Sequence, residues 1–294
     1  MSLISLLNRL PGGIAQGLIW GIMALGVYIT FRVLNESDLT VDGSFATGGA
    51  VAIVSIRAGV NPILAILFAF GAGLLCGCVT GLIHTKFKIP SILSGILVQL
   101  ALYAINLHIM DMSSNIAVGL DTTNLLVTIR NVSKSILIVG GIAVAIIAIM
   151  YWYFGTEQGC AIRATGNSNH MAIAQGINID NMKVISFALG NGLVALAGAI
   201  LSEYQGYADI NMGRGAIVIG LAAIIIGEAF SKAIFKKGCS FWVRLLFVVF
   251  GGIIYYTVMV LILWLRIDSN DLKLFTAIIV LFFLAIPNLK KGRN

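Results

Sequence analysis

The sequence predicts an all-α integral membrane protein, and three observations support this fold class. Hydrophobic residues make up 59% of the 294 residues and charged residues 11%, against roughly 45–50% and about 25% in soluble domains. The mean hydropathy is +0.99. Apolar runs of the length that crosses a bilayer as a helix recur along the chain. We expect such helices, in a single transmembrane domain covering 1-294, near residues 12-32, 62-83, 90-109, 135-154, 183-203, 214-235, 240-265 and 272-288.

The number of crossings depends on one further apolar stretch, residues 43-57, which is short and rich in small residues. If it enters and leaves on the same face, then Arg9, the Lys86/Lys88 loop and Arg163 all fall on one side, which the positive-inside rule assigns to the cytoplasm. We therefore expect about eight transmembrane helices plus one re-entrant or broken helix, with both termini cytoplasmic. The alternative is a full crossing by 43-57, for nine to ten crossings in all, which would place Arg9 and the Lys86/Lys88 loop on opposite faces.

A polar sequence, residues 35-44, joins the first helix to this stretch and contains Asp42 and Ser44. The small-residue stretch that follows cannot complete its backbone hydrogen bonds cheaply in lipid unless protein or water surrounds it. Broken segments of this kind line translocation routes in transporters. Asp42 and Ser44 therefore either belong to a substrate pathway or cap the start of a structural helix.

The run at 62-83 carries Gly73, Gly77 and Gly81 at intervals of four residues, so the three lie on one helix face. Small residues in this pattern let helix backbones approach closely in lipid. We interpret this face as a packing surface within one subunit, with a contact between subunits as the alternative.

Several polar side chains lie within or at the end of otherwise apolar runs. Gln99, Asn106 and Asn191 each either bond to a neighbouring helix or line a substrate pathway. Glu228 precedes Lys232 by four residues, so the two can form an ion pair on one helix face near the inner surface. A gating or energy-coupling role for Glu228 is the alternative.

Two connections are longer than simple turns. The loop at 110-134 is expected on the extracytoplasmic side, where its length indicates a small folded piece. The segment 156-178 is expected in the cytoplasm and is too polar and too short to span. Within it, Asn167 or Ser168 can cap a helix that ends before Gly176 in a left-handed stop. We expect this segment to be a surface that contacts another protein.

Three groups of residues resemble those of one family. They are Arg163-Ala-Thr-Gly-Asn167 followed by Met171-Ala-x-Ala-Gln-Gly-Ile-Asn178, then Asp38-Leu-Thr-Val-Asp-Gly-Ser-Phe45, and Ile219-Gly-Leu-Ala-Ala-Ile-Ile-Ile-Gly-Glu228. They are similar to the permeases of ATP-binding cassette importers of the branched-chain amino acid and ribose type. The likeness extends over nearly the whole chain and is greatest to the tryptophan/tyrosine permease subgroup.

The resemblance implies a multi-pass protein of the bacterial cell membrane that works in an assembly. Its partners would be a second permease copy, two cytoplasmic ATP-binding subunits that bind ATP and Mg²⁺, and an extracytoplasmic solute-binding lipoprotein. A heterodimer of two permeases stays open as an alternative to the homodimer. By the same resemblance, 156-178 would be a coupling-helix loop that docks on the ATPase through Arg163, Ala164, Thr165, Gly166, Asn167, His170, Met171, Ala174 and Gly176.

The residues themselves agree with a subunit that depends on a partner. The sequence contains no Gly-x-x-x-x-Gly-Lys-Ser/Thr phosphate loop, no catalytic set and no metal-binding cluster. Topology accounts for the basic charge, so nucleic acid is not expected as a partner. We predict a permease subunit, not an enzyme and without a cofactor of its own, that moves a small solute such as an amino acid, aromatic ones included.

A secondary transporter or channel driven by an ion gradient is the second hypothesis. It would need a coupling carboxylate within the membrane, and Glu228 is the candidate. The sequence does not name the solute; other amino acids, small peptides and nucleoside-like or sugar-like compounds stay open.

Overall fold

The structure is a computed structural model and describes residues 3–118, 125–235, 240–264, 274 and 281. Almost every element in this part of the chain is a helix. The elements are α1 (Leu3–Tyr28), η1 (Ile29–Val33), α2 (Thr40–Arg57), α3 (Pro62–Lys86), α4 (Ser91–Ile109), β1 (Asn115–Ala117), η2 (Ile129–Asn131), α5 (Val132–Gly155), α6 (Glu157–Asn167), α7 (Asn169–Ala174), α8 (Ile179–Gln205), β2 (Tyr207–Asp209), α9 (Ala216–Ile234) and α10 (Phe241–Trp264).

Seven helical segments in the described part of the chain are long and apolar enough to cross a membrane. They contain α1 with η1, α3, α4, α5, α8, α9 and α10, and they agree with seven of the eight expected runs. The eighth, 272-288, lies outside the described residues except for 274 and 281. The all-α membrane fold class is therefore confirmed.

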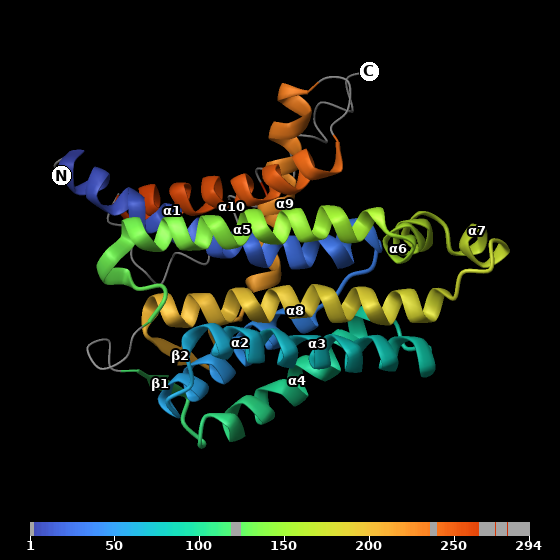
Figure 1. Cartoon of the computed structure of the whole chain (residues 1–294), viewed down its shortest axis with the longest axis horizontal. Coiled ribbons are helices and arrows are strands. Elements are labelled where there is room, and N and C mark those ends of the chain that lie inside the picture. Colours follow the sequence, from blue (N-terminus) through green and yellow to red (C-terminus); the bar gives the residue numbers. More distant parts are fainter. Residues whose placement is uncertain (1–2, 119–124, 236–239, 265–273, 275–280, 282–294) are drawn as a thin grey trace.

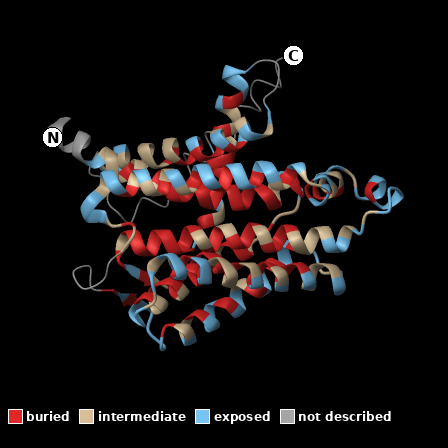
Figure 2. Ribbon diagram, in the orientation of Figure 1, coloured by how far each residue is buried: buried red, intermediate tan, exposed pale blue. Residues whose placement is uncertain are grey.

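The long helices lie side by side, which gives the molecule two ends (Figure 1). One end carries α6 and α7 and is called here the α6–α7 end. The other carries the two short strands and the start of α1 and is called the β1–β2 end. Buried residues concentrate in α1, α2 and α8, while α4 and α5 keep exposed faces (Figure 2). The core of the molecule is therefore the contact between α8 and the helices around it.

The structure corrects the expected topology at the N-terminus. The chain starts α1 at the β1–β2 end, so the N-terminus and 156-178 do not share a face (Figure 1). The reason is α2, an unbroken helix of 18 residues that, at 1.5 Å per residue, is about 27 Å long. It runs back to the β1–β2 end and does not re-enter its own face. The start of α1 therefore lies at the opposite end from 156-178, contrary to what we expected of the N-terminus; the C-terminal residues lie outside the described part of the chain.

The break expected within 43-57 is absent, and the backbone is irregular just before α2 instead; residues 29–39 are called here the break. Residues Ile29–Val33 form a π-helical turn, Leu34 N donates to Ile29 O, and Asn35 has a φ of 61° in the left-handed region. Isolated π turns of this kind are frequent at functional sites. The chain then turns back into the bundle through residues 34–39.

Glycine lets α2 and α3 approach α8 with their backbones. A Cβ at Gly77 of α3 would overlap the backbone of Phe187, and one at Gly81 would lie 2.7 Å from the Cα of Val184. On α2, a Cβ at Gly48 would overlap the backbone of Ala195. The expected packing surface of α3 is therefore a contact within the subunit.

The two strands fasten part of the 110-134 loop to the end of α8. They pair antiparallel, with Asn115 opposite Asp209 and Ala117 opposite Tyr207. This pairing is the small folded piece expected in 110-134; residues 119–124 of that loop lie outside the described part of the chain.

Candidate functional site

A buried polar network lies at the centre of the bundle. Asn191, near the middle of α8, donates from Nδ2 to Asp38 Oδ2 at 2.6 Å, and Ser44 Oγ donates to Asn191 Oδ1 at 2.7 Å. Asp38 Oδ1 also accepts from Thr40 N at 2.9 Å, while the hydroxyls of Thr40 and Thr80 lie 2.8 Å apart. All five residues are at most 2% exposed. The network joins the break to α2, α3 and α8.

Sequence reasoning found only part of this network. Ser44 and Asn191 belong to the expected pathway set and do meet here. Asp38, Thr40 and Thr80 were not in that set. The alternating polar residues of 35-44 signalled Asp38 and Thr40, but nothing in the sequence pairs Thr80 with them.

The Asp42 side chain binds backbone N–H groups at the start of α9. Its carboxylate accepts from Gly215 N at 2.9 Å and from Ile217 N at 3.0 Å. Two free backbone N–H groups at a helix start are stabilised by an anionic acceptor. Asp42 therefore caps α9, and the geometry separates it from the Asp38–Asn191 network.

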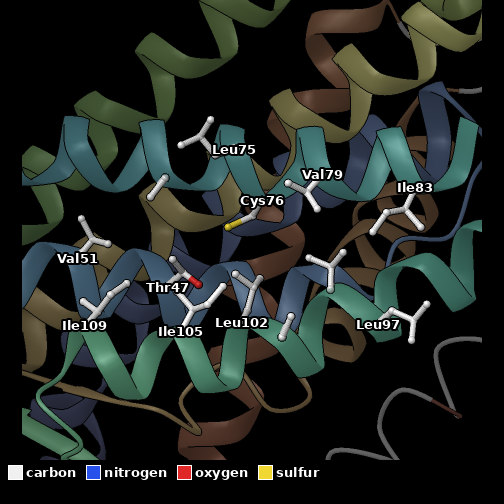
Figure 3. A pocket seen from close by; sticks show the side chains of 13 residues that line it. Thr47, Val51, Leu75, Cys76, Val79, Ile83, Leu97, Leu102, Ile105 and Ile109 are labelled. Carbon is white, nitrogen blue, oxygen red and sulfur yellow. The ribbon is translucent and has the colours of Figure 1, made fainter. Parts of the chain in front are cut away.

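The remaining pathway candidates, Gln99 and Asn106, lie on α4. Asn106 is 1% exposed, and its side-chain oxygen lacks a hydrogen-bond partner in the described part of the chain. Next to them, a groove of about 410 Å³ separates α3 from α4. Figure 3 shows apolar side chains of α3 and α4 along this groove, together with Cys76 of α3 and with Thr47 and Val51 of α2. The groove presents almost no polar group to a ligand.

A cluster of charged groups lies toward the α6–α7 end. Lys183 Nζ is 2.7 Å from Glu36 Oε1 and 3.1 Å from His84 Nε2, and Ser91 Oγ donates to Glu36 Oε2 at 2.8 Å. Hydrogen bonding from His84, Lys183 and Ser91 outweighs burial and lowers the pKa of Glu36 to about 2. The cluster ties the start of α8 to the residues that follow η1.

Glu228 has a closer partner than the one expected. It pairs with Arg32 of η1, whereas Lys232 lies 3.9 Å away with a side chain that is 81% exposed. An exposed pair at that distance adds little stability. Sequence reasoning missed Arg32 because it lies 196 residues away in the chain.

The segment 156-178 forms two helices. Ser168 caps α7 by accepting from Met171 N at 3.4 Å, and Gly176 follows with a φ of 79°, so the expected cap and stop are confirmed. His170, Met171 and Ala174 are exposed; Met171 is 63% exposed.

Of the other residues expected on this surface, Arg163, Thr165 and Gly166 pack on the bundle, while Asn167 and Gly176 are exposed. Arg163 donates to Phe154 O and lies over the ring of Phe241. Thr165 is 2% exposed, and a Cβ at Gly166 would overlap the backbone of Val33. Residues Arg163 to Gly166 therefore hold α6 against the bundle, while α7 projects from it (Figure 1).

Comparison with known proteins gives a consistent result. Residues 10–285 match the model of a family described as "Branched-chain amino acid transport system / permease component". A tyrosine transport system permease protein of Clostridioides difficile is 37% identical over 275 residues, which cover 93% of this chain and 90% of that protein. The ribose import permease protein RbsC of Escherichia coli is 26% identical over 225 residues, covering 75% and 69%.

One solved structure has the same fold. It is PsaBC from Streptococcus pneumoniae in complex with Fab, which matches with a TM-score of 0.52 over 94% of this chain and 90% of that one. The sequence identity is 13%, so this likeness concerns the fold alone.

Proposed function

This chain belongs to the family of branched-chain amino acid transport permeases, and from that premise we propose that it imports an aromatic amino acid. Permeases of this family are the membrane-spanning subunits of ATP-binding cassette importers and are not enzymes. The observation that carries the choice of solute is the 37% identity to a tyrosine transport permease over 93% of the chain. By that relation we place it in a bacterial cell membrane.

The assembly that we propose contains two copies of this chain and two cytoplasmic ATP-binding subunits, which hold ATP and Mg²⁺. An extracytoplasmic lipoprotein binds the solute and delivers it. The family relation supports the ATPase and the binding protein. The copy numbers rest on the resemblance of the sequence to permeases that work as pairs.

We place the ATPase contact on α7. Its exposed residues His170, Met171, Ile173 and Ala174 offer an apolar strip beside a polar group. A short amphipathic helix of this kind fits a groove on a partner. Arg163, Ala164, Thr165, Gly166 and Asn167 belong to α6, which connects this contact surface to the bundle, and Gly176 ends the segment.

The ATPase contact surface on α7 is connected to the buried network through α6, α8 and the break. Gly166 of α6 packs against Val33, and Lys183, near the start of α8, binds Glu36 at 2.7 Å. The first contact holds Val33, at the end of η1, and the second holds Glu36, two positions before Asp38. We propose that displacing α6 and α7 shifts the break and so rearranges the hydrogen bonds among Asp38, Asn191 and Ser44.

The proposed solute path runs past Ser44 and Asn191, with Gln99 and Asn106 of α4 as further candidates. Polar side chains at this depth are costly unless they bond to one another or face a cavity. Asp42 contributes by fixing the start of α9. Glu228, with Arg32 and Lys232, forms an ion-pair group near the α6–α7 end that we assign to gating.

Reconstitution tests this function against the ion-gradient alternative. We expect proteoliposomes with this chain, its ATPase and its binding protein to accumulate L-tyrosine only with ATP and Mg²⁺. Uptake by this chain alone, driven by a proton or sodium gradient, would establish the secondary transporter instead. In that case Glu228→Gln should abolish the gradient dependence.

A further inference from the structure

A second cavity, of about 340 Å³, lies at the β1–β2 end. Its walls come from α1, α8, α10 and both strands, so it is built by elements that are distant in the sequence. The side chains that matter for recognition are Gln16, Trp20, Gln205, Asp209, Asn211 and Tyr256. A volume of this order accommodates a small ligand. Polar and apolar groups share the lining, in contrast to the groove between α3 and α4.

The apolar part of the cavity is aromatic. Trp20 is 6% exposed and stacks on Tyr256 with ring centres 5.8 Å apart and planes 23° from parallel. Trp20 also stacks on Phe45, with ring centres 4.9 Å apart. Phe45 follows Ser44 of the buried network directly in the chain. The stack of three rings therefore connects the cavity lining to the residue that follows Ser44.

The polar part carries one charge. Among the described residues that line the cavity, Asp209 is the only charged one. Its Oδ1 accepts from Asn211 N at 2.7 Å and its Oδ2 from Asn115 Nδ2 at 3.4 Å, which fixes the carboxylate while leaving lone pairs open. Gln16 and Gln205 add half-buried amides.

We propose that this cavity receives the transported amino acid, an inference that rests on the proposed import function. The ammonium group of the solute binds the Asp209 carboxylate, and the amide N–H groups of Gln16 and Gln205 donate to its carboxylate. The side chain of the solute lies against Trp20 and Tyr256, where an aromatic ring gains stacking as well as burial. Separation of the Trp20–Phe45 stack then opens the way to Ser44.

Protection of an introduced thiol tests this assignment. In the complex with its ATPase, and with the native cysteines replaced by serine, Gln16→Cys should react with a membrane-impermeant methanethiosulfonate added at the β1–β2 face. L-Tyrosine should slow that reaction, L-leucine less so, and D-ribose not at all. The matched control is Ala58→Cys, which is exposed in the turn after α2 at the same end; its rate should not change with any of the three.

Two further substitutions in the Gln16→Cys background test the contacts. Asp209→Asn should raise the L-tyrosine concentration for half protection about tenfold, because a hydrogen bond to a charged group is lost. Trp20→Leu should remove the preference for L-tyrosine over L-leucine, and Trp20→Phe should retain it. Protection by D-ribose equal to that by L-tyrosine, or no protection by either, would overturn the proposal.

The wild-type complex separates the two possible failures. If it accumulates L-tyrosine with ATP while the thiol at position 16 stays unprotected, the cavity assignment fails and the import function stands. If ATP drives no amino acid uptake by the wild type, the proposed function fails at its own test.

Discussion

Asn191 is the residue on which the centre of the bundle depends. It donates to Asp38 and accepts from Ser44, so one amide satisfies both a buried carboxylate and a buried hydroxyl. A buried polar group that loses its partner costs about 1–3 kcal/mol, and more when it is charged. The side chain therefore fixes how α8 packs against the break and α2.

We expect Asn191→Ala to lower the free energy of unfolding by about 1–3 kcal/mol, because Asp38 and Ser44 lose their shared partner. ATP-driven uptake should fall with it. Thermal unfolding of the purified chain in detergent measures the first effect and proteoliposome uptake the second. Asn181→Ala, an exposed side chain on the same helix, is the control; equal stability of the two variants would contradict the role given to Asn191.

Ionisation of Glu36 makes the stability contributed by the charged cluster toward the α6–α7 end depend on pH. Its pKa is lowered from 4.5 to about 2 by hydrogen bonds from His84, Lys183 and Ser91. Because the folded state holds the carboxylate ionised, Glu36 contributes stability above pH 4.5, and that contribution disappears as the pH falls toward 2.

We therefore expect Glu36→Gln to lower the free energy of unfolding at pH 7 by an amount on the order of 1–2 kcal/mol after allowance for partial exposure. The difference between wild type and variant should narrow as the pH falls from 4.5 to 3, because the contribution is lost toward pH 2. Unfolding curves of both proteins from pH 7 to 3 measure this. A gap that is the same at both pH values would show that Glu36 acts only through its shape.

Among the elements, α2, α3 and α8 form a unit held by backbone contact. The sequence predicted the small-residue face of α3 correctly, because glycines four residues apart share one side of any helix. It did not predict that α2 is continuous. An 18-residue helix rich in Gly, Ala and Ser is too weakly apolar to be recognised as a span, yet it needs no lipid-facing surface when protein surrounds it.

We expect Gly77→Ala to destabilise the chain by about 1–3 kcal/mol, since the new Cβ has no space beside the backbone of Phe187. The matched control lies on the same helix: Gly71 has open space where a Cβ would be, and Gly71→Ala should be neutral or slightly stabilising. Thermal unfolding compares the two. A Gly77→Ala variant as stable as Gly71→Ala would mean that α3 and α8 can separate without loss.

For the molecule as a whole, the sequence predicted class, family and most helices, but it failed at the N-terminal face. Arg9 is a single charge, and the positive-inside count gave it the same weight as the loops with several lysines. The turn at Asn35 and the return of α2 depend on contacts with α8, which no local pattern reports. The same limit explains why Thr80 was missed; the polar pattern of 35-44 does contain Asp38, but nothing local pairs it with Asn191.

The assembly with the ATPase depends on the exposed strip of α7, and it yields the last prediction. Met171 and Ile173 are 63% and 55% exposed, so replacing both with glutamate should leave the unfolding temperature unchanged. If the strip fills a groove on the ATPase, burying two carboxylates there is costly, and the ATPase should no longer co-purify or support uptake. Asn169→Ala, at the exposed start of α7, is the control and should bind normally. Arg163→Ala should differ from both, because Arg163 holds α6 to Phe154 and Phe241: we expect lower stability with the ATPase still bound. Normal ATPase binding by the double glutamate variant would mean that the partner contacts another surface.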